Sequence, residues 1–367
     1  MFLESGKGGI GHIKLSGPLE FPPRLETVAR IMEDTYGHRI SYLRVSITDR
    51  CNERCHYCMP EEVQEWLPRD GILSYEELLR VIRVGTGLGI HKVRITGGEP
   101  LTRRDVLSFF RAVHQLEGID DIGVSTNGTL LATEPEESGV TMAQHLVNAG
   151  VRTANISLDT LDPEIYHQTT GRDYFDRVMK GIDAARAAGF EKIKINAVLM
   201  RDSNEDQLVP LVRFAQEREL LLRFIELMPV STQDVLKDDR FLATGKAKQV
   251  LEEAFGLLTP RPEYKTNGPA SYYEVPDSSG QLIGFIGAMT NLHFCESCNK
   301  LRLTCDGKLR PCLGSYLEFD LKEVLRCPDV TDAEIADFFK HVVERKPKEH
   351  DFRNDYTPNR KMIAIGG

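Results

Sequence analysis

The chain has 367 residues and a net charge of −9, with 41% hydrophobic and 28% charged residues. These proportions exclude a disordered or fibrous protein, and the length fits a domain of about 200–250 residues with an appendage. No apolar run approaches the roughly 18 residues of a membrane span, and residues 1–20 lack the apolar segment of a secretory signal. A negative chain has no bulk attraction for nucleic acid or anionic lipid. We expect a protein of a reducing compartment, cytoplasmic or within an organelle, without a nucleic-acid or membrane partner.

Short β-rich runs alternate with amphipathic helical stretches from about residue 40 onward. Ser74 and Glu77 have the spacing of a capping box, which predicts a helix that begins there and ends near Gly87. Further helices are expected at 176–189 and 205–218. The runs with strand character cover residues 42–47, 92–97, 122–127, 153–159, 192–200 and 221–227.

Six such units in a row predict an α/β fold, an incomplete (β/α)6 TIM-type barrel whose open side another part of the chain must cover. The alternation stops near residue 230. Beyond it we expect a helix around 243–255, strand-like runs, a hairpin turn at Asp306-Gly307 and a helix-rich stretch at 317–347. The predicted organisation is an N-terminal extension (1–40), a partial barrel (41–230) and a C-terminal α+β cap (231–367).

Three cysteines, Cys51, Cys55 and Cys58, directly follow the first predicted strand. In a large chain without an export signal, such spacing favours a metal site over disulfides. Three thiolates can bind three irons of a 4Fe–4S cluster and leave the fourth iron open for a small molecule. The position after a barrel strand, where catalytic loops gather, and the aromatic Tyr57 favour this interpretation. Buried structural cysteines or a zinc site are the alternatives.

This triplet resembles the signature of the radical S-adenosylmethionine (radical SAM) superfamily, in which an aromatic residue precedes the last cysteine. In that superfamily the open iron binds the amino and carboxyl groups of S-adenosylmethionine, which is cleaved to methionine and a 5′-deoxyadenosyl radical. Residues 97–100 (GGEP), after the second strand, resemble the segment that faces the methionine amino group.

A second triplet, Cys295, Cys298 and Cys312, lies near the C-terminus. On spacing alone it fits a zinc site equally well, with Cys305 as a fourth ligand. Its surroundings, HFCESCNKLRLTCDGKLRPCLGS, and the terminal Gly366-Gly367 resemble the GTP 3′,8-cyclase family of molybdenum cofactor biosynthesis. So do LRVSITDRCNERCHYCMP, VRITGGEPLTRRD, NISLDTL, KINAVLMRDSNEDQ and RFIELMP, in order along the chain. Cys305 and Cys327 lie outside the family pattern and are expected to be inert thiols.

The resemblance implies two 4Fe–4S clusters, the second of which binds the guanine of GTP. The adenosyl radical would remove the ribose 3′ hydrogen, and the carbon radical would add to guanine carbon 8. Reduction would then give 3′,8-cyclo-7,8-dihydro-GTP. The implied partners are GTP, an external electron donor and a downstream cyclic pyranopterin monophosphate synthase. We expect a monomer or a homodimer.

The site residues also follow from the resemblance. S-adenosylmethionine would contact Tyr57, Gly98, Ser157 and Met228. The catalytic residues would be Arg302 and the tail residues Gly366 and Gly367, which insert toward the active site in that family. GTP would contact Arg44, Arg94, Ser125, Lys194, Lys300, Leu301 and Arg302, with Arg223 as a further candidate because it also stands in a strand run.

The basic residues are expected at or near the carboxyl ends of the strands, or just after the second Cys pair for Lys300 and Arg302, where one pocket could collect them. Lys300 stands where the family usually has arginine, so it offers a point charge in place of a bidentate fork. Asn127 and Glu226 are weaker candidates at strand ends. A radical SAM peptide-modifying enzyme with auxiliary clusters is an alternative, although such enzymes usually carry more C-terminal cysteines. An electron-transfer or zinc-stabilised binding protein is the non-catalytic alternative.

Overall fold

A computed structural model describes residues 31–59, 65–135, 139–230, 240–276, 278, 280–354, 356, 358 and 360–366. The expected extension at 1–40 therefore lies mostly outside the described residues. Its last part forms a small hairpin of β1 (Met32–Glu33) and β2 (Arg39–Ile40). Within the described residues, no helix combines the length and the apolar character needed to cross a bilayer.

The centre of the molecule is one curled sheet whose order is β14-β13-β12-β3-β4-β5-β6-β7-β8-β11-β10-β9. All six predicted barrel strands are confirmed as parallel neighbours: β3 (Tyr42–Ser46), β4 (Lys92–Thr96), β5 (Asp121–Thr126), β6 (Val151–Ser157), β7 (Lys192–Leu199) and β8 (Leu221–Glu226).

The C-terminal half extends this sheet at both edges. β12 (Lys300–Leu303) pairs in parallel with β3, and β11 (Leu282–Ile286) pairs in parallel with β8. Antiparallel strands then continue each edge: β13 (Lys308–Arg310), β14 (Phe319–Asp320), β10 (Ser271–Glu274) and β9 (Thr259–Pro260). The hairpin turn at Asp306-Gly307 is confirmed between β12 and β13. Because both halves share one sheet, the boundary near residue 230 stays a prediction.

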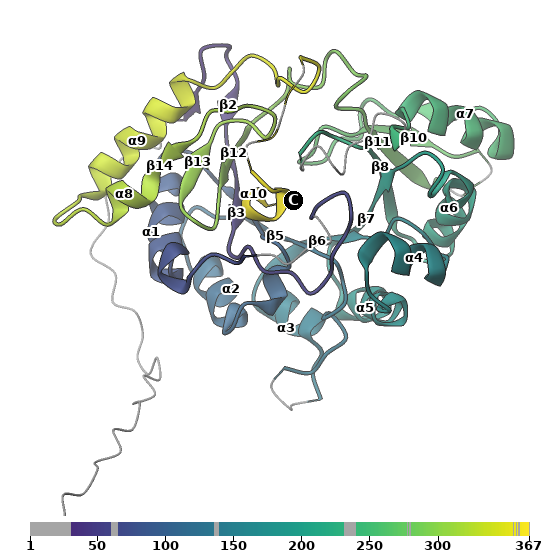
Figure 1. The fold of residues 1–367 in the computed structure, drawn as a ribbon, viewed down its shortest axis with the longest axis horizontal. Coiled ribbons are helices and arrows are strands. Elements are labelled where there is room, and N and C mark those ends of the chain that lie inside the picture. Colours follow the sequence, from purple (N-terminus) through teal and green to yellow (C-terminus); the bar gives the residue numbers. More distant parts are fainter. Residues whose placement is uncertain are drawn as a thin grey trace, which may run out of the picture.

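Helices cover the outer face of the sheet, and the strands curl around a central space that holds a short C-terminal helix (Figure 1). The helices are α1 (Tyr75–Thr86), α2 (Val106–His114), α3 (Met142–Asn148), α4 (Pro163–Thr170), α5 (Phe175–Ala188), α6 (Leu208–Glu217), α7 (Thr244–Phe255), α8 (Leu321–Leu325), α9 (Asp332–Glu344) and α10 (Met362–Ile365). Short 3-10 turns cover Arg69–Gly71, Pro100–Thr102 and Glu205–Gln207.

Local sequence explains where the predicted helices begin. Ser74 and Glu77 form the expected capping box at the start of α1. Pro210 lies in the first turn of α6, where its missing N–H costs no intrahelical hydrogen bond, so this helix begins at Leu208 without a kink at its centre. The incomplete parallel barrel with a C-terminal α+β part is thus the observed fold class.

Strand alternation separates a hydrophobic outer layer from a polar interior. In β3, Leu43 and Val45 are fully buried in the core between sheet and helices, whereas Tyr42 and Arg44 line the central cavity. In β12, Leu301 belongs to the same core and Arg302 to the cavity. The interior of the barrel is therefore a polar chamber, while the apolar core lies outside it.

Gly181 lets α5 pack closely against the loop that follows β5. An added Cβ at this position would overlap the backbone carbonyl of Gly128. We expect Gly181→Ala to lower the free energy of unfolding by about 1–3 kcal/mol, because backbone must move to admit the methyl group. Chemical denaturation of the apoprotein measures this.

The matched control for this substitution is Gly245→Ala in α7. Gly245 is exposed, and no atom lies within 4 Å of an added Cβ there. Since alanine favours the helix, this variant should be as stable as the parent chain or slightly more stable. Equal stability of the Gly181→Ala and Gly245→Ala proteins would contradict the packing argument.

Candidate functional site

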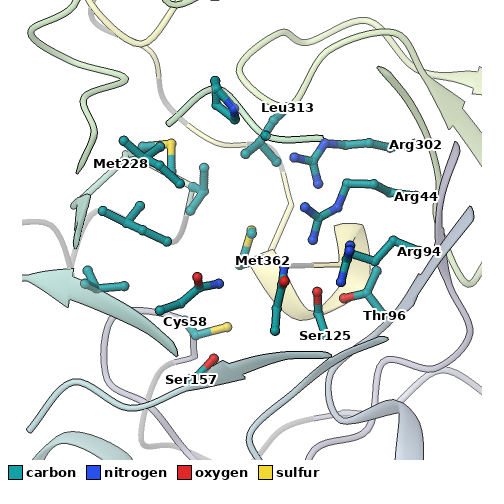
Figure 2. Close-up of a pocket in the computed structure, with 18 of the residues that line it drawn as sticks. Arg44, Cys58, Arg94, Thr96, Ser125, Ser157, Met228, Arg302, Leu313 and Met362 are labelled. Carbon is teal, nitrogen blue, oxygen red and sulfur yellow. The ribbon is translucent and has the colours of Figure 1, made fainter. Parts of the chain in front are cut away.

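One cavity of about 360 Å³ opens inside the barrel, within the range of roughly 300–1,000 Å³ typical of small-molecule sites. Its lining contains both cysteine triplets and the predicted basic residues. Figure 2 shows Arg44, Arg94 and Arg302 reaching in from one side, with Cys58 and Ser157 across the cavity from them. Segments more than 200 residues apart in the chain therefore meet around a single chamber.

The first triplet lies at the carboxyl end of β3. The Gly98 amide donates to the Thr48 carbonyl (2.8 Å), and the Glu99 amide donates to the Arg50 carbonyl (2.8 Å). A side chain at Gly98 would overlap the backbone of Arg50. Neither Gly97 nor Gly98 has a positive φ. The glycine pair is thus required by close backbone approach to the cysteine loop.

A network of hydrogen bonds from residues at the ends of β4 and β5 fixes the loop that carries the first triplet. Asn127 Nδ2 donates to Asn52 Oδ1 (2.8 Å), and Asn52 Nδ2 donates to Thr129 Oγ1 (2.8 Å). The buried Glu99 carboxylate accepts from the Asn127 amide (2.7 Å) and from Thr126 Oγ1 (2.9 Å). Asn127 therefore holds the loop between Cys51 and Cys55 in place.

Three buried carboxyl groups lie around the first triplet. Burial raises the pKa of Glu53 to about 7, of Glu99 to about 7 and of Asp159 to about 6. Tyr57 donates its hydroxyl to Asp159 Oδ2 (2.8 Å). Burial also raises the pKa of the Cys58 thiol to about 12, so these thiols need a bound cation to ionise.

The second triplet lies at the opposite end of the parallel strands. Cys295 and Cys298 precede β12, and Cys312 follows β13, which runs back antiparallel beside β12. All three cysteines line the cavity. The two triplets therefore lie at the two ends of the same chamber, the first at the carboxyl ends and the second at the amino ends of the strands.

The arrangement of the cysteines in the two triplets suits 4Fe–4S clusters better than a single metal ion. In a 4Fe–4S cluster each thiolate binds its own iron, so the sulfur atoms must stand apart. Among the described residues, no three histidine, cysteine or acidic side chains converge on one metal-ion position. Cys305 is fully buried in the protein and absent from the cavity lining, and Cys327 is exposed. The four-thiolate zinc alternative is thus not assembled.

Strand register aligns the basic residues. Arg302 pairs with Arg44 across β12 and β3, and Arg44 pairs with Arg94 across β3 and β4, so the three guanidinium groups form a row on one face. For Arg44 and Arg94, the expectation of a position at or near a strand carboxyl end is wrong. Arg44 and Arg94 are the third residues of five-residue strands. The positive charge is therefore inside the barrel, between the two cysteine triplets.

Neighbouring residues hold these side chains in fixed positions. Arg94 donates to the Tyr42 hydroxyl (2.7 Å), the Val124 carbonyl (2.9 Å) and Thr153 Oγ1 (2.8 Å). Gly123 on β5 leaves room for the Arg94 guanidinium, which a Cβ would displace.

Two further cations line the cavity from β7 and β8. Lys194 is 3% exposed and Arg223 is 5% exposed. Arg223 donates twice to Asn196 Oδ1 (3.0 and 2.6 Å), so an amide and not a carboxylate orients it.

The basic residues of the ligand-free chamber repel one another. Burial and the nearby Arg302 lower the pKa of Arg44 to about 9. Burial, with Arg223 and Arg94 nearby, lowers the pKa of Lys194 to about 6. Within the described part of the chain, Arg94, Arg223 and Arg302 have no carboxylate ion-pair partner. Since buried cations are costly without a counter-charge, an anionic ligand would stabilise these three arginines.

The C-terminal tail enters the barrel. Met362 and Ile363 line the cavity, and the Gly366 carbonyl accepts from Arg302 Nη1 (2.9 Å). Gly366 has φ +89°, and a Cβ there would lie 2.7 Å from Thr96 Cγ2. Only glycine fits this position without strain. Gly367 lies outside the described residues.

The other predicted site residues fall into two groups. Ser125, Ser157, Met228 and Lys300 line the cavity. The Leu301 side chain lies in the hydrophobic core, away from the cavity. Glu226 lines the cavity, but its carboxylate accepts from the amides and hydroxyls of Thr244 and Thr290. It therefore links β8 to the start of α7 and to the 287–290 loop.

Sequence reasoning missed several lining residues. Tyr42, Asn155 and Asn196 reach the cavity from inward positions of β3, β6 and β7. The available signal was a polar residue at every second position of an otherwise apolar run, as in NISL and KIKINAV. His350 and Phe352 also line it, and no strand pattern points to them.

Comparison with known proteins agrees with this geometry. Residues 45–215 match the model of the Radical SAM superfamily, and residues 220–352 match that of Molybdenum Cofactor Synthesis C. A GTP 3′,8-cyclase from Thermodesulfovibrio yellowstonii is 42% identical over 92% of this chain and 100% of its own length. One from Agrobacterium fabrum is 42% identical over 95% and 97%. The chain belongs to the GTP 3′,8-cyclase family.

Solved structures support the fold. Streptococcus suis SuiB bound to S-adenosylmethionine superposes with a TM-score of 0.53 at 18% identity, covering 81% of this chain and 68% of that one. SuiB bound to its precursor peptide SuiA gives 0.54 at 19%, covering 79% and 65%. At this identity the likeness concerns the fold alone. Members of the cyclase family use S-adenosylmethionine and two 4Fe–4S clusters, so this chain is an enzyme of that type.

The two triplets can be tested separately by iron analysis. After anaerobic reconstitution, the parent chain should bind about eight irons, and Cys58→Ala and Cys312→Ala should each bind about four, because a triplet that has lost one thiolate no longer holds its cluster. Cys327→Ala, at an exposed position, is the matched control and should retain about eight. Undiminished iron in either of the first two variants would remove that cysteine from the ligand set.

Proposed function

We propose that this chain converts GTP to 3′,8-cyclo-7,8-dihydro-GTP with S-adenosylmethionine and a reductant, which is the first step of molybdenum cofactor biosynthesis. The other products are 5′-deoxyadenosine and methionine. The observation that supports this most strongly is the row of Arg302, Arg44 and Arg94 between two cysteine triplets at opposite ends of one chamber. A triphosphate matches the positive row, and each triplet leaves one iron of its cluster for a small molecule.

The first triplet, with Cys51, Cys55 and Cys58, would hold the cluster beside S-adenosylmethionine. When bound, that cluster supplies the electron that splits S-adenosylmethionine into methionine and the 5′-deoxyadenosyl radical. Gly98, Ser157 and Met228 line this part of the chamber. Tyr57, held by Asp159, closes it on one side. Their role is to orient the cosubstrate toward the centre of the barrel.

The second triplet, with Cys295, Cys298 and Cys312, would hold the cluster beside GTP. Arg44, Arg94, Lys194, Arg223, Lys300 and Arg302 would neutralise the triphosphate, and Ser125 lines the chamber next to them. Lys300 donates to Asn299 Oδ1 (3.2 Å) and adds charge without a bidentate fork. Arg302, oriented by the Gly366 carbonyl, connects substrate and tail.

The arrangement favours catalysis by placement. A radical that attacks ordinary C–H bonds requires its target within contact distance and requires that water be excluded. The tail helix α10 fills part of the barrel interior and contributes Met362 and Ile363 to the lining. The proposal also includes an external electron donor, a downstream synthase that consumes the cyclised nucleotide, and a reducing compartment.

GTP-dependent cleavage of S-adenosylmethionine tests the proposed reaction. Reduced, reconstituted protein should form 5′-deoxyadenosine and the cyclised nucleotide when GTP is present. Cys312→Ala should lower cyclisation at least about 100-fold, because the nucleotide is no longer held in place, while it leaves uncoupled cleavage measurable. Liquid chromatography with mass spectrometry measures both products. Equal stimulation by ATP or by a peptide would refute the proposal and favour the peptide-modifying alternative.

The lowered pKa of Lys194 predicts proton uptake on GTP binding. With a pKa of about 6, Lys194 is largely neutral in the free chain at pH 7.5. A bound triphosphate favours the ammonium, so the affinity that Lys194 contributes should fall as pH rises above about 6, by at most tenfold per unit. Calorimetric titration in two buffers of different ionisation enthalpy counts the protons.

Lys194→Met should bind GTP more weakly and take up one proton less. Lys180→Met, an exposed position on α5, is the matched control and should behave as the parent chain. The protonation of GTP itself is common to all three proteins and cancels in the difference. Identical proton uptake by the parent chain and Lys194→Met would contradict the prediction.

A further inference from the structure

A buried lysine joins the two segments that carry the second triplet. Lys346 follows α9 and is 4% exposed. Its Nζ donates to the Lys300 carbonyl (3.1 Å) and to the Pro311 carbonyl (2.5 Å). Lys300 is two positions beyond Cys298, and Pro311 directly precedes Cys312. One ammonium group therefore connects the Cys295–Cys298 segment to Cys312.

Within the described part of the chain, Lys346 has no carboxylate ion-pair partner, and two of its hydrogen-bond acceptors are neutral carbonyls. Removing an ammonium ion from water costs several kcal/mol unless an anion compensates it. The side chain is not among those that line the cavity, so a bound nucleotide is not its direct partner. The negative charge that compensates the Lys346 ammonium group must therefore come from the cysteines on the two segments that it connects.

The groups on which the Lys346 charge acts are the three cysteines. The Cys298 thiol lies within hydrogen-bond reach of the Lys346 ammonium group. The carbonyl that precedes Cys312 accepts from the same ammonium group (2.5 Å).

We propose that Lys346 is a positioning residue for the second 4Fe–4S cluster, which connects its two ligand segments and supplies the positive charge that balances the thiolates. This inference rests on the proposed assignment of Cys295, Cys298 and Cys312 as ligands. Three thiolates and a cluster of charge +2 leave a net negative unit, and reduction adds one further negative charge. A fixed ammonium beside it stabilises the reduced form more than the oxidised form, and so raises the reduction potential.

The first triplet has different surroundings. The buried acidic groups Glu53, Glu99 and Asp159 lie around it, and Arg54 Nη1 donates to the Cys51 carbonyl (2.7 Å). Carboxylates destabilise an added electron and lower a reduction potential, as suits a centre that must reduce a sulfonium. The second triplet thus has a buried ammonium group beside it, whereas buried carboxyl groups lie beside the first.

The test isolates the second cluster in the full-length chain. A parent in which Cys51, Cys55 and Cys58 are all alanine carries only that cluster, and a redox titration followed by electron paramagnetic resonance gives its potential. Lys346→Met should lower the equilibrium constant for reduction at least tenfold, which is about 59 mV for one electron. Lys346→Arg keeps the charge and should stay within threefold of the parent. Lys340→Met, an exposed position on α9, is the matched control.

Lys346→Gln separates the connection of the two ligand segments from the supply of positive charge, because it keeps an amide donor and removes the charge. It also replaces Lys346→Met if that protein fails to fold. If Lys346→Met or Lys346→Gln binds four irons with the potential of the parent, the proposal is overturned. It is also overturned if Lys346→Arg loses iron as readily as Lys346→Met. Iron retained after Cys312→Ala in this parent would instead refute the ligand assignment, so the two failures are distinguishable.

Discussion

The constraint on which this structure depends is the cost of burying several cations in one chamber. Arg302, Arg44 and Arg94 stand side by side because strand register fixes them there. Within the described residues, hydroxyl and carbonyl groups orient the guanidinium groups of Arg94 and Arg302 but supply no negative charge. In the proposed function, the bound triphosphate supplies the negative charge that stabilises this arrangement.

The same reasoning explains why the apolar core lies outside the barrel. Leu43, Val45 and Leu301 face the helices and bury hydrophobic surface there. Alternate residues of the same strands are then free to face the interior with polar groups. The outer face of the sheet thus supplies the hydrophobic burial that stabilises the fold, and the inner face carries the polar residues of the chamber. The burial on the outer face offsets the free energy lost by burying charge inside.

The two cysteine triplets differ in what surrounds them. Carboxyl groups and a tyrosine lie beside the first triplet, at the strand carboxyl ends. Basic residues and main-chain carbonyls lie beside the second, at the amino ends. Since β12 joins the sheet next to β3, the C-terminal half is part of the chamber wall. Loss of that pairing would remove both the second triplet and Arg302 from the site.

Sequence alone determined the cysteine spacings, the strand and helix order, and the types of residue in the site, because these depend on local periodicity and short motifs. It could not determine that Arg44 and Arg94 lie at mid-strand, that Leu301 faces the core, or that Asn127 and Glu226 hold loops. Lys346 gave no signal at all, since it precedes a loop and resembles a surface lysine. Those features depend on register and on contacts between distant segments, which exist only once the sheet has formed.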